Sequence, residues 1–93
     1  MELTGVIKEI GTTQEFGQNG FTKRQLVLET DGEYPQKFGI EFIKDKTKVL
    51  DNYNVGENVV VGVNLRSRSY TNKDFEEVYI TSLQGWRIVK NGS

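Results

Sequence analysis

Two arginines and a tyrosine, at alternate positions of one predicted strand, are the residues best suited to do chemistry in this sequence. They are Arg66, Arg68 and Tyr70, at the far end of an apolar run that begins at Val59. Strand side chains alternate between faces, so these three share one face. Guanidinium groups pair with phosphate oxygens, and an aromatic ring stacks on a base. The spacing therefore favours a surface for an extended nucleic-acid strand, although a solvated strand end could carry the same residues.

The charge balance of the chain does not by itself indicate a protein that binds polyanions. The 93 residues carry a net charge of -1 and the pI is about 5.4, whereas affinity for nucleic acid depends on neutralising phosphates. Two stretches without acids, residues 16–28 and 62–73, hold five basic residues: Lys23, Arg24, Arg66, Arg68 and Lys73. A fold that brings these stretches together would give one surface a local positive charge.

The composition excludes several classes of chemistry. The sequence has no cysteine and no histidine, which excludes disulfides, the common zinc sites and every nucleophile or base built on those residues. The adjacent acids Glu76 and Glu77 would point to opposite faces of a strand. We therefore expect a protein that is not an enzyme and that uses no cofactor and no metal.

Length and hydropathy predict one domain without a membrane segment. Chains of 93 residues rarely support two cores, so residues 1–93 are expected to form a single domain. No apolar run approaches the ~20 residues of a membrane-spanning helix. The first residues open directly into a strand pattern rather than a signal peptide. We expect a cytoplasmic protein.

Hydrophobic alternation and turn residues predict five strands and one short helix. The strands span residues 3–10, 21–30, 36–43, 59–70 and 75–89, and the helix spans residues 44–53. Gly5 marks a bend that lets the first strand serve two parts of a curled sheet, and a bulge is expected near Gln84 and Gly85. This order is typical of an all-β, five-stranded Greek-key OB-fold barrel with one short helix between strands 3 and 4. The alternative is an SH3-like small barrel, which usually lacks that helix.

The same alternation predicts which side chains form the core. The expected core-facing sets are Leu26 and Leu28; Phe38, Ile40 and Phe42; and Val59, Val61, Val63 and Leu65. The helix should contribute an apolar stripe of Val49, Leu50 and Tyr53. Asn19 and Gly20 predict a tight turn, and Gly56 is suited to left-handed backbone after the helix.

From Phe42 to Tyr70 the chain resembles, without a gap, the bacterial single-stranded-DNA-binding protein (SSB) family. The shared pattern is an aromatic residue ending the third strand, a short helix, a glycine and a valine, and then L-R-x-R-x-aromatic. Here these are Phe42, Gly56, Val59 and Leu65-Arg66-Ser67-Arg68-Ser69-Tyr70. The chain is also similar to a small SSB-like family of uncharacterised phage and bacterial proteins that share a late tryptophan, here Trp86. It departs from the SSB pattern at Val63, where SSBs usually have glycine, and at Gln36, where they have tryptophan.

The resemblance implies roles for individual residues. Phe42 and Tyr70 would stack on bases, and Arg66 and Arg68 would line the same channel. Hydrophobic alternation instead places Phe42 in the core, so both interpretations of this residue stay open. The complete predicted nucleic-acid-binding set is Lys23, Arg24, Tyr34, Lys37, Phe42, Arg66, Arg68, Tyr70 and Lys73.

The leading interpretation is sequence-tolerant binding of single-stranded DNA, with RNA left open as a ligand, in DNA replication, recombination or repair. The alternative is an OB-fold module for protein-protein contact that binds no nucleic acid. Because one small domain offers few stacking sites, we expect a homo-oligomer, a dimer rather than a tetramer. Trp86 is expected in the core or at the subunit interface. The resemblance implies a bacterial cell or a phage-infected host.

Overall fold

Six strands and one helix make up the computed structural model, which describes residues 1–17 and 20–91. In chain order they are β1 (Glu2–Ile10), β2 (Gln14–Phe16), β3 (Phe21–Thr30), β4 (Lys37–Ile43), the 3-10 helix η1 (Lys44–Asn52), β5 (Asn58–Thr71) and β6 (Glu77–Lys90). The five predicted strands and the helix are all present, in the predicted order. The short strand β2 was not predicted.

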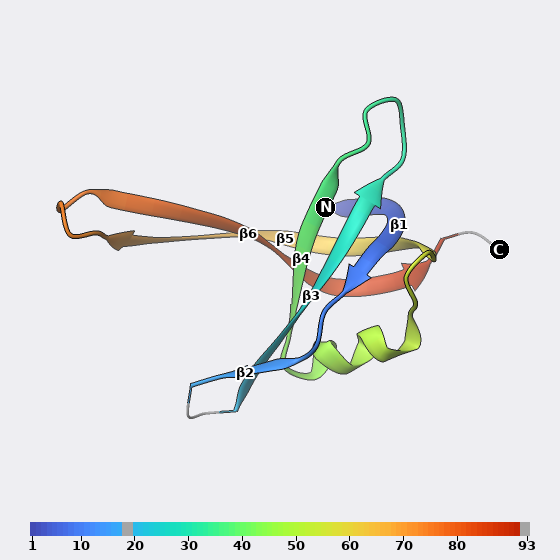
Figure 1. Ribbon diagram of the computed structural model, residues 1–93, viewed down its shortest axis with the longest axis horizontal. Coiled ribbons are helices and arrows are strands. Elements are labelled where there is room, and N and C mark those ends of the chain that lie inside the picture. The colour runs from blue at the N-terminus through green and yellow to red at the C-terminus, as the bar shows by residue number, and fades with distance from the viewer. Residues whose placement is uncertain (18–19, 92–93) are drawn as a thin grey trace.

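The strands close into a ring because β1 pairs with strands on both of its sides. The neighbours run β1-β5-β6-β4-β3, and β3 pairs again with β1. Gly5 lies at the shared point, opposite Thr30 on β3 and Val59 on β5. A Cβ atom there would lie 2.1 Å from the carbonyl oxygen of Glu29, so the close approach of the two strands requires glycine. This closed ring, with η1 between β4 and β5 (Figure 1), is the OB-fold topology that the sequence predicts.

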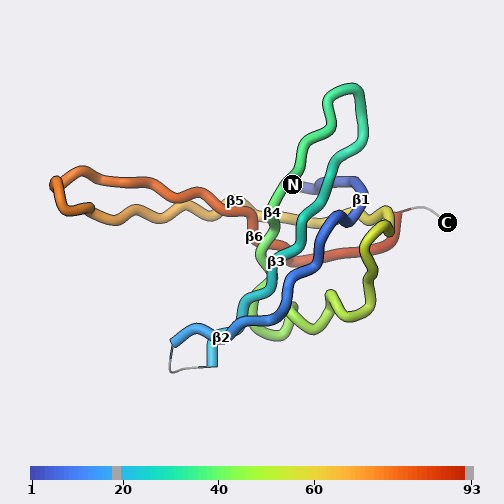
Figure 2. Tube along the Cα trace, in the orientation of Figure 1, coloured from blue at the N-terminus to red at the C-terminus, as the bar shows by residue number. Residues whose placement is uncertain are grey.

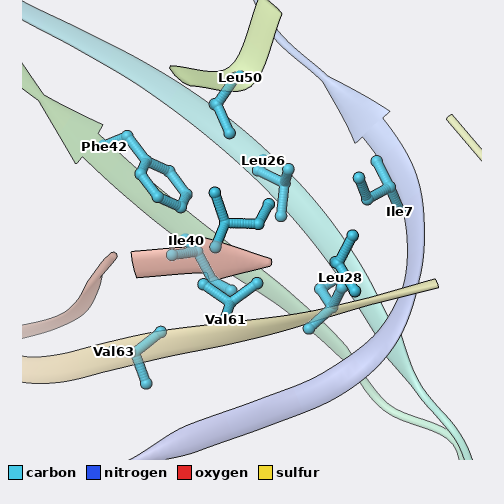
Figure 3. Packing of buried hydrophobic residues seen from close by; sticks show 10 residues of the cluster. Ile7, Leu26, Leu28, Ile40, Phe42, Leu50, Val61 and Val63 are labelled. Carbon is cyan, nitrogen blue, oxygen red and sulfur yellow. The ribbon is translucent and has the colours of Figure 1, made fainter. Parts of the chain in front are cut away.

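The core fills the interior of this ring. Its buried members are Ile7, Leu26, Leu28, Ile40, Phe42, Leu50, Val59, Val61, Val63 and Ile88, and Figure 3 shows them packed between the strands and η1. The alternation predicted for β3, β4 and the first half of β5 is therefore confirmed. Val49 and Tyr53 pack against the core from the helix and its end, as their spacing predicts.

The outer halves of β5 and β6 leave the ring and form a hairpin arm, defined here as residues 64–82. The two strands stay paired from Val63 and Gly85 to Thr71 and Glu77. Figures 1 and 2 show the arm extending away from the other strands. Leu65, predicted to be a core residue, lies in this arm and is 60% exposed. The prediction was wrong because alternation fixes the face of a side chain but not the point at which the covering strands end.

The turns and the bulge agree in part with the sequence pattern. Gly56 has a φ of +98°, as predicted for left-handed backbone. The predicted turn at Asn19 lies outside the described residues. Phe75, predicted to begin the last strand, lies instead in the tip of the arm with a φ of +62° and is almost fully exposed. Across the described ranges 1–17 and 20–91, no helix has the length and apolarity needed to cross a bilayer.

Candidate nucleic-acid interface

A groove of about 320 Å³ lies where the arm leaves the barrel. Its lining comes from the beginning of β3, the end of β4 and the inner part of the arm. We call it the basic groove; its lining residues are Phe21, Lys23, Glu41, Ile43, Arg66, Ser67, Arg68, Ile80, Ser82 and Gln84. The fold therefore brings Lys23, from one acid-free stretch, together with Arg66 and Arg68, from the other.

Arg66 and Arg68 form one wall of the basic groove. They lie two residues apart on β5, opposite Ser82 and Ile80 of β6, so all four side chains share a face. The Nε of Arg66 donates a hydrogen bond to Oε1 of Gln84 at 2.9 Å. Neither arginine forms an ion pair with any residue that the structure describes. Their charges are therefore not neutralised by an acid in the described chain.

Tyr70 continues the row toward the end of the arm. It is the next residue of β5 on the face of Arg66 and Arg68, and it lies opposite Val78. Its side chain is 52% exposed. The predicted alignment of two cations and one ring along a single strand face is thus present.

Lys23 stands on the opposite wall and is held by one acid. Its Nζ lies 3.4 Å from Oε1 of Glu41, and both side chains are about one-third exposed. The same Nζ lies 5.4 Å from the centroid of the Phe16 ring, within cation-π range. Glu41 is the one acid among the described lining residues. Because its negative charge opposes a phosphate, Glu41 should weaken anion binding at this wall.

Two phenylalanines that the site prediction omitted lie beside Lys23. Phe16 on β2 is directly opposite Phe21 on β3, so their side chains lie on one face of that hairpin. Phe21 is half-buried and lines the groove, and Phe16 is largely exposed. Exposed rings beside cations are suited to base stacking. The signal in the sequence was their near-symmetric placement around the turn predicted at Asn19 and Gly20, since a hairpin at that point would pair them.

Arg24 serves the fold and does not face the groove. Its Nε donates to the carbonyl oxygen of Gly11 at 2.7 Å, and its Nη1 lies 2.6 Å from Oδ1 of Asp51 and 3.2 Å from the carbonyl oxygen of Thr47. Its side chain is only 15% exposed. Alternation along β3 turns Arg24 away from Lys23, toward η1. The predicted phosphate contact is therefore not available in this arrangement.

Phe42 is the second predicted residue that the structure removes from the interface. It is 1% exposed, and a Cβ atom at Gly85 would lie 2.4 Å from its ring. The ring thus fills the barrel against β6. Its assignment as a base-stacking residue is contradicted by this burial, whereas the alternation that made it a core residue is confirmed.

Three further predicted residues lie away from the groove. Lys37 pairs with Glu29 at one end of the β3–β4 ladder, whereas Lys23 pairs with Ile43 at the other; six residues of strand separate the two ends by roughly 20 Å. Tyr34 is highly exposed in the loop that follows β3. Lys73 lies in the turn at the tip of the arm. None of the three lines the basic groove.

Within residues 1–17 and 20–91, no three acidic side chains gather closely enough to hold an ion. Glu57, which does not line the groove, has a shifted pKa. A backbone hydrogen bond from Asn54, followed by the charge of Lys90, lowers the pKa of the Glu57 carboxyl, with partial desolvation acting against them.

Comparison with known proteins supports the fold. Residues 2–89 match the profile of a family described as a domain of unknown function, DUF3127. An SSB domain from Synechococcus sp. is similar, with a TM-score of 0.70 and 17% identity over 95% of this chain and 90% of that one. A mitochondrial single-stranded DNA binding protein from S. cerevisiae has a TM-score of 0.69 and 18% identity over 99% and 95%. No curated protein matches the sequence. At such low identity the two structures establish a shared OB-fold of the SSB type.

Proposed function

Since the chain belongs to the DUF3127 family and has an OB-fold of the SSB type, we propose that it binds single-stranded DNA with little sequence preference. Bases would stack on Tyr70, Phe21 and Phe16. Phosphates would pair with Arg66, Arg68 and Lys23. We place this binding in DNA replication, recombination or repair, and we expect the protein to act as a homo-oligomer in the cytoplasm. Of the two similar structures reported above, one is named an SSB domain and the other a mitochondrial single-stranded DNA binding protein.

The observation that carries the proposal is the pair Arg66 and Arg68. Two guanidinium groups share one strand face, line a groove with a third cation and have no acidic partner among the described residues. By contrast, the other two arginines, Arg24 and Arg87, are each paired with an acid, as are three of the lysines. A groove lined by three cations and an aromatic ring suits phosphate pairing and base stacking.

The direct test is binding of fluorescent oligo-dT at low salt, measured by anisotropy, with duplex DNA and an RNA of equal length as competitors. Single strands should compete and the duplex should not, because a stacked base must have a free face. Tyr70→Ala should weaken binding about 5- to 150-fold, the range expected for ~1–3 kcal/mol per stacked base.

Tyr34→Ala is the matched control, since Tyr34 is an exposed tyrosine in the loop after β3 and does not share the strand face of Arg66, Arg68 and Tyr70. It should leave the affinity unchanged. If no single-stranded oligonucleotide binds at low salt, the proposal is wrong and a protein-protein interaction module becomes the better assignment. If RNA competes better than DNA, the ligand class changes while the site remains.

A further inference from the structure

Trp86 occupies an unusual position in the β5–β6 ladder. Gly62 pairs with Arg87 while Val63 pairs with Gly85, so Trp86 is an extra residue in a bulge and has no partner on β5. Bulges re-aim a side chain relative to its neighbours. Here the indole lies across Gly62, where a Cβ atom would come within 2.8 Å of it. Trp86 is nevertheless 45% exposed. Its ring therefore packs against Gly62 without being buried in the core.

A small depression of about 200 Å³ opens beside this ring. It lies between β6 and η1 and is lined by Phe42, Lys46, Val49, Trp86, Arg87 and Ile88. The phenylalanine, valine and isoleucine give it an apolar floor, and the lysine and arginine supply charge. Lys46 has no ion pair with any described residue. Arg87 is paired with Glu2 at 3.7 Å, and both side chains are about half exposed. A pair so exposed contributes little, so a phosphate can replace the carboxylate at small cost.

The depression follows the basic groove along β6. Gln84 lines the groove and Trp86, two residues further along β6, lines the depression. Two strand residues span roughly 7 Å, comparable to the step between neighbouring nucleotides of an extended strand. Alternation also places Gly62, which supports the indole, on the face of β5 that carries Arg66.

We propose that this depression is a second nucleotide subsite, which extends the basic groove toward η1. A base would stack on the exposed face of Trp86, and the adjoining phosphate would pair with Lys46 and Arg87. This inference rests on the proposed function, because it continues the path of the same bound strand. The depression takes a nucleobase with its phosphate because a supported aromatic face and two cations meet there, without an acid among its described lining residues.

Trp86 is the one tryptophan of the chain and therefore reports on its own environment. Two signals are followed in one titration of the intact protein with oligo-dT: anisotropy of a label on the oligonucleotide, and intrinsic tryptophan emission. A base stacked on the indole should quench the emission in step with the anisotropy. Oligonucleotides of increasing length should show quenching only once they are long enough to reach past the basic groove.

Variants separate stacking from a structural role of the indole. Trp86→Ala should weaken binding about 5- to 150-fold, and Trp86→Phe should retain most of the affinity because a ring remains. Lys46→Ala should reduce the slope of log K against log salt by about 0.7. Lys46 is exposed on η1, so this variant tests the subsite even if Trp86→Ala does not fold.

Three results would overturn the inference. Binding that leaves the emission unchanged, with the same affinity in Trp86→Ala, would show that the strand does not reach the depression, while the proposed function would stand. An unchanged affinity with a smaller mass of Trp86→Ala in sedimentation would assign the ring to an interface between copies of the chain. Absence of any binding by anisotropy would remove the proposed function itself, and the subsite with it.

Discussion

Removal of Arg66 and Arg68 together should change how strongly DNA binding depends on salt. Three cations line the basic groove, namely these two arginines and Lys23. With about -0.7 in slope for each phosphate neutralised on a single strand, three contacts predict a slope of log K against log salt of about -2.1. The affinity of the unmodified protein should then fall about 18-fold between 50 and 200 mM salt.

The double variant Arg66→Ala, Arg68→Ala leaves one of these contacts. Its slope should be about -0.7, and the same increase in salt should reduce its affinity only about 2.6-fold. Oligo-dT anisotropy over a salt series measures both slopes. If the subsite at Trp86 also binds, both slopes steepen by its own contacts, but the difference between them stays about 1.4.

A variant that removes the same net charge elsewhere provides the control. Lys8 and Lys90 are paired with Glu29 and Glu57 and line none of the groove. The variant Lys8→Ala, Lys90→Ala should therefore keep the slope of the unmodified protein. Equal slopes in all three proteins would refute the reasoning, because the arginines would then contact no phosphate. Equal losses in the two double variants would show that net charge, rather than the groove, governs binding.

Three other outcomes follow from single residues. Glu41→Gln should raise affinity for oligo-dT about fivefold, since a like charge ~4 Å from a phosphate costs ~1 kcal/mol in water; an unchanged or weaker affinity in the titration would show that Glu41 lies off the strand's path. Gly5→Ala should lower the unfolding free energy by about 1–3 kcal/mol or more, because its methyl group would overlap the carbonyl oxygen of Glu29; a melting temperature equal to that of the unmodified protein would contradict the close approach. Hydrogen bonding from Asn54 lowers the pKa of the Glu57 carboxyl below 4.5 in the folded state. The carboxylate therefore stabilises the fold above pH 4.5, and this stabilisation is lost as the pH falls through the lowered pKa. Glu57→Gln should therefore be less stable than the unmodified protein at neutral pH and equal to it in strong acid, as measured by urea unfolding, and a difference that does not depend on pH would contradict the assignment.

The barrel could be predicted from the sequence because its elements obey local rules. Strand β3 begins and ends at the predicted residues, and the inward set of β5 is buried as far as Val63. These features depend on alternation and turn residues within a few positions of one another. Local pattern does not show where one strand extends beyond its neighbours. Leu65 was therefore wrongly assigned to the core.

The candidate site was predicted less completely because its members depend on partners far along the chain. Arg24 forms an ion pair with Asp51, which lies 27 positions away, and no residue near Arg24 in the sequence indicates this partner. Phe16 and Phe21 become neighbours only through the three-residue strand β2, which is too short for a pattern to identify. Arg66, Arg68 and Tyr70 were placed correctly on one face because a single strand carries all three. The direction of the Trp86 side chain is set by a bulge, and this bulge exists only because of how β5 and β6 pair.

The double pairing of β1 has a consequence for how the molecule folds. Gly5 must pair with Val59, so the ring closes only when two segments separated by more than half of the chain come together. Such sequence-distant pairing is entropically expensive to initiate, and domains dominated by it reach the native state in milliseconds to seconds rather than microseconds. The hairpin of β5 and β6, joined by a short turn, can form early. Closure by β1 is then expected to be the late, rate-limiting step, so changes at Gly5 should slow refolding.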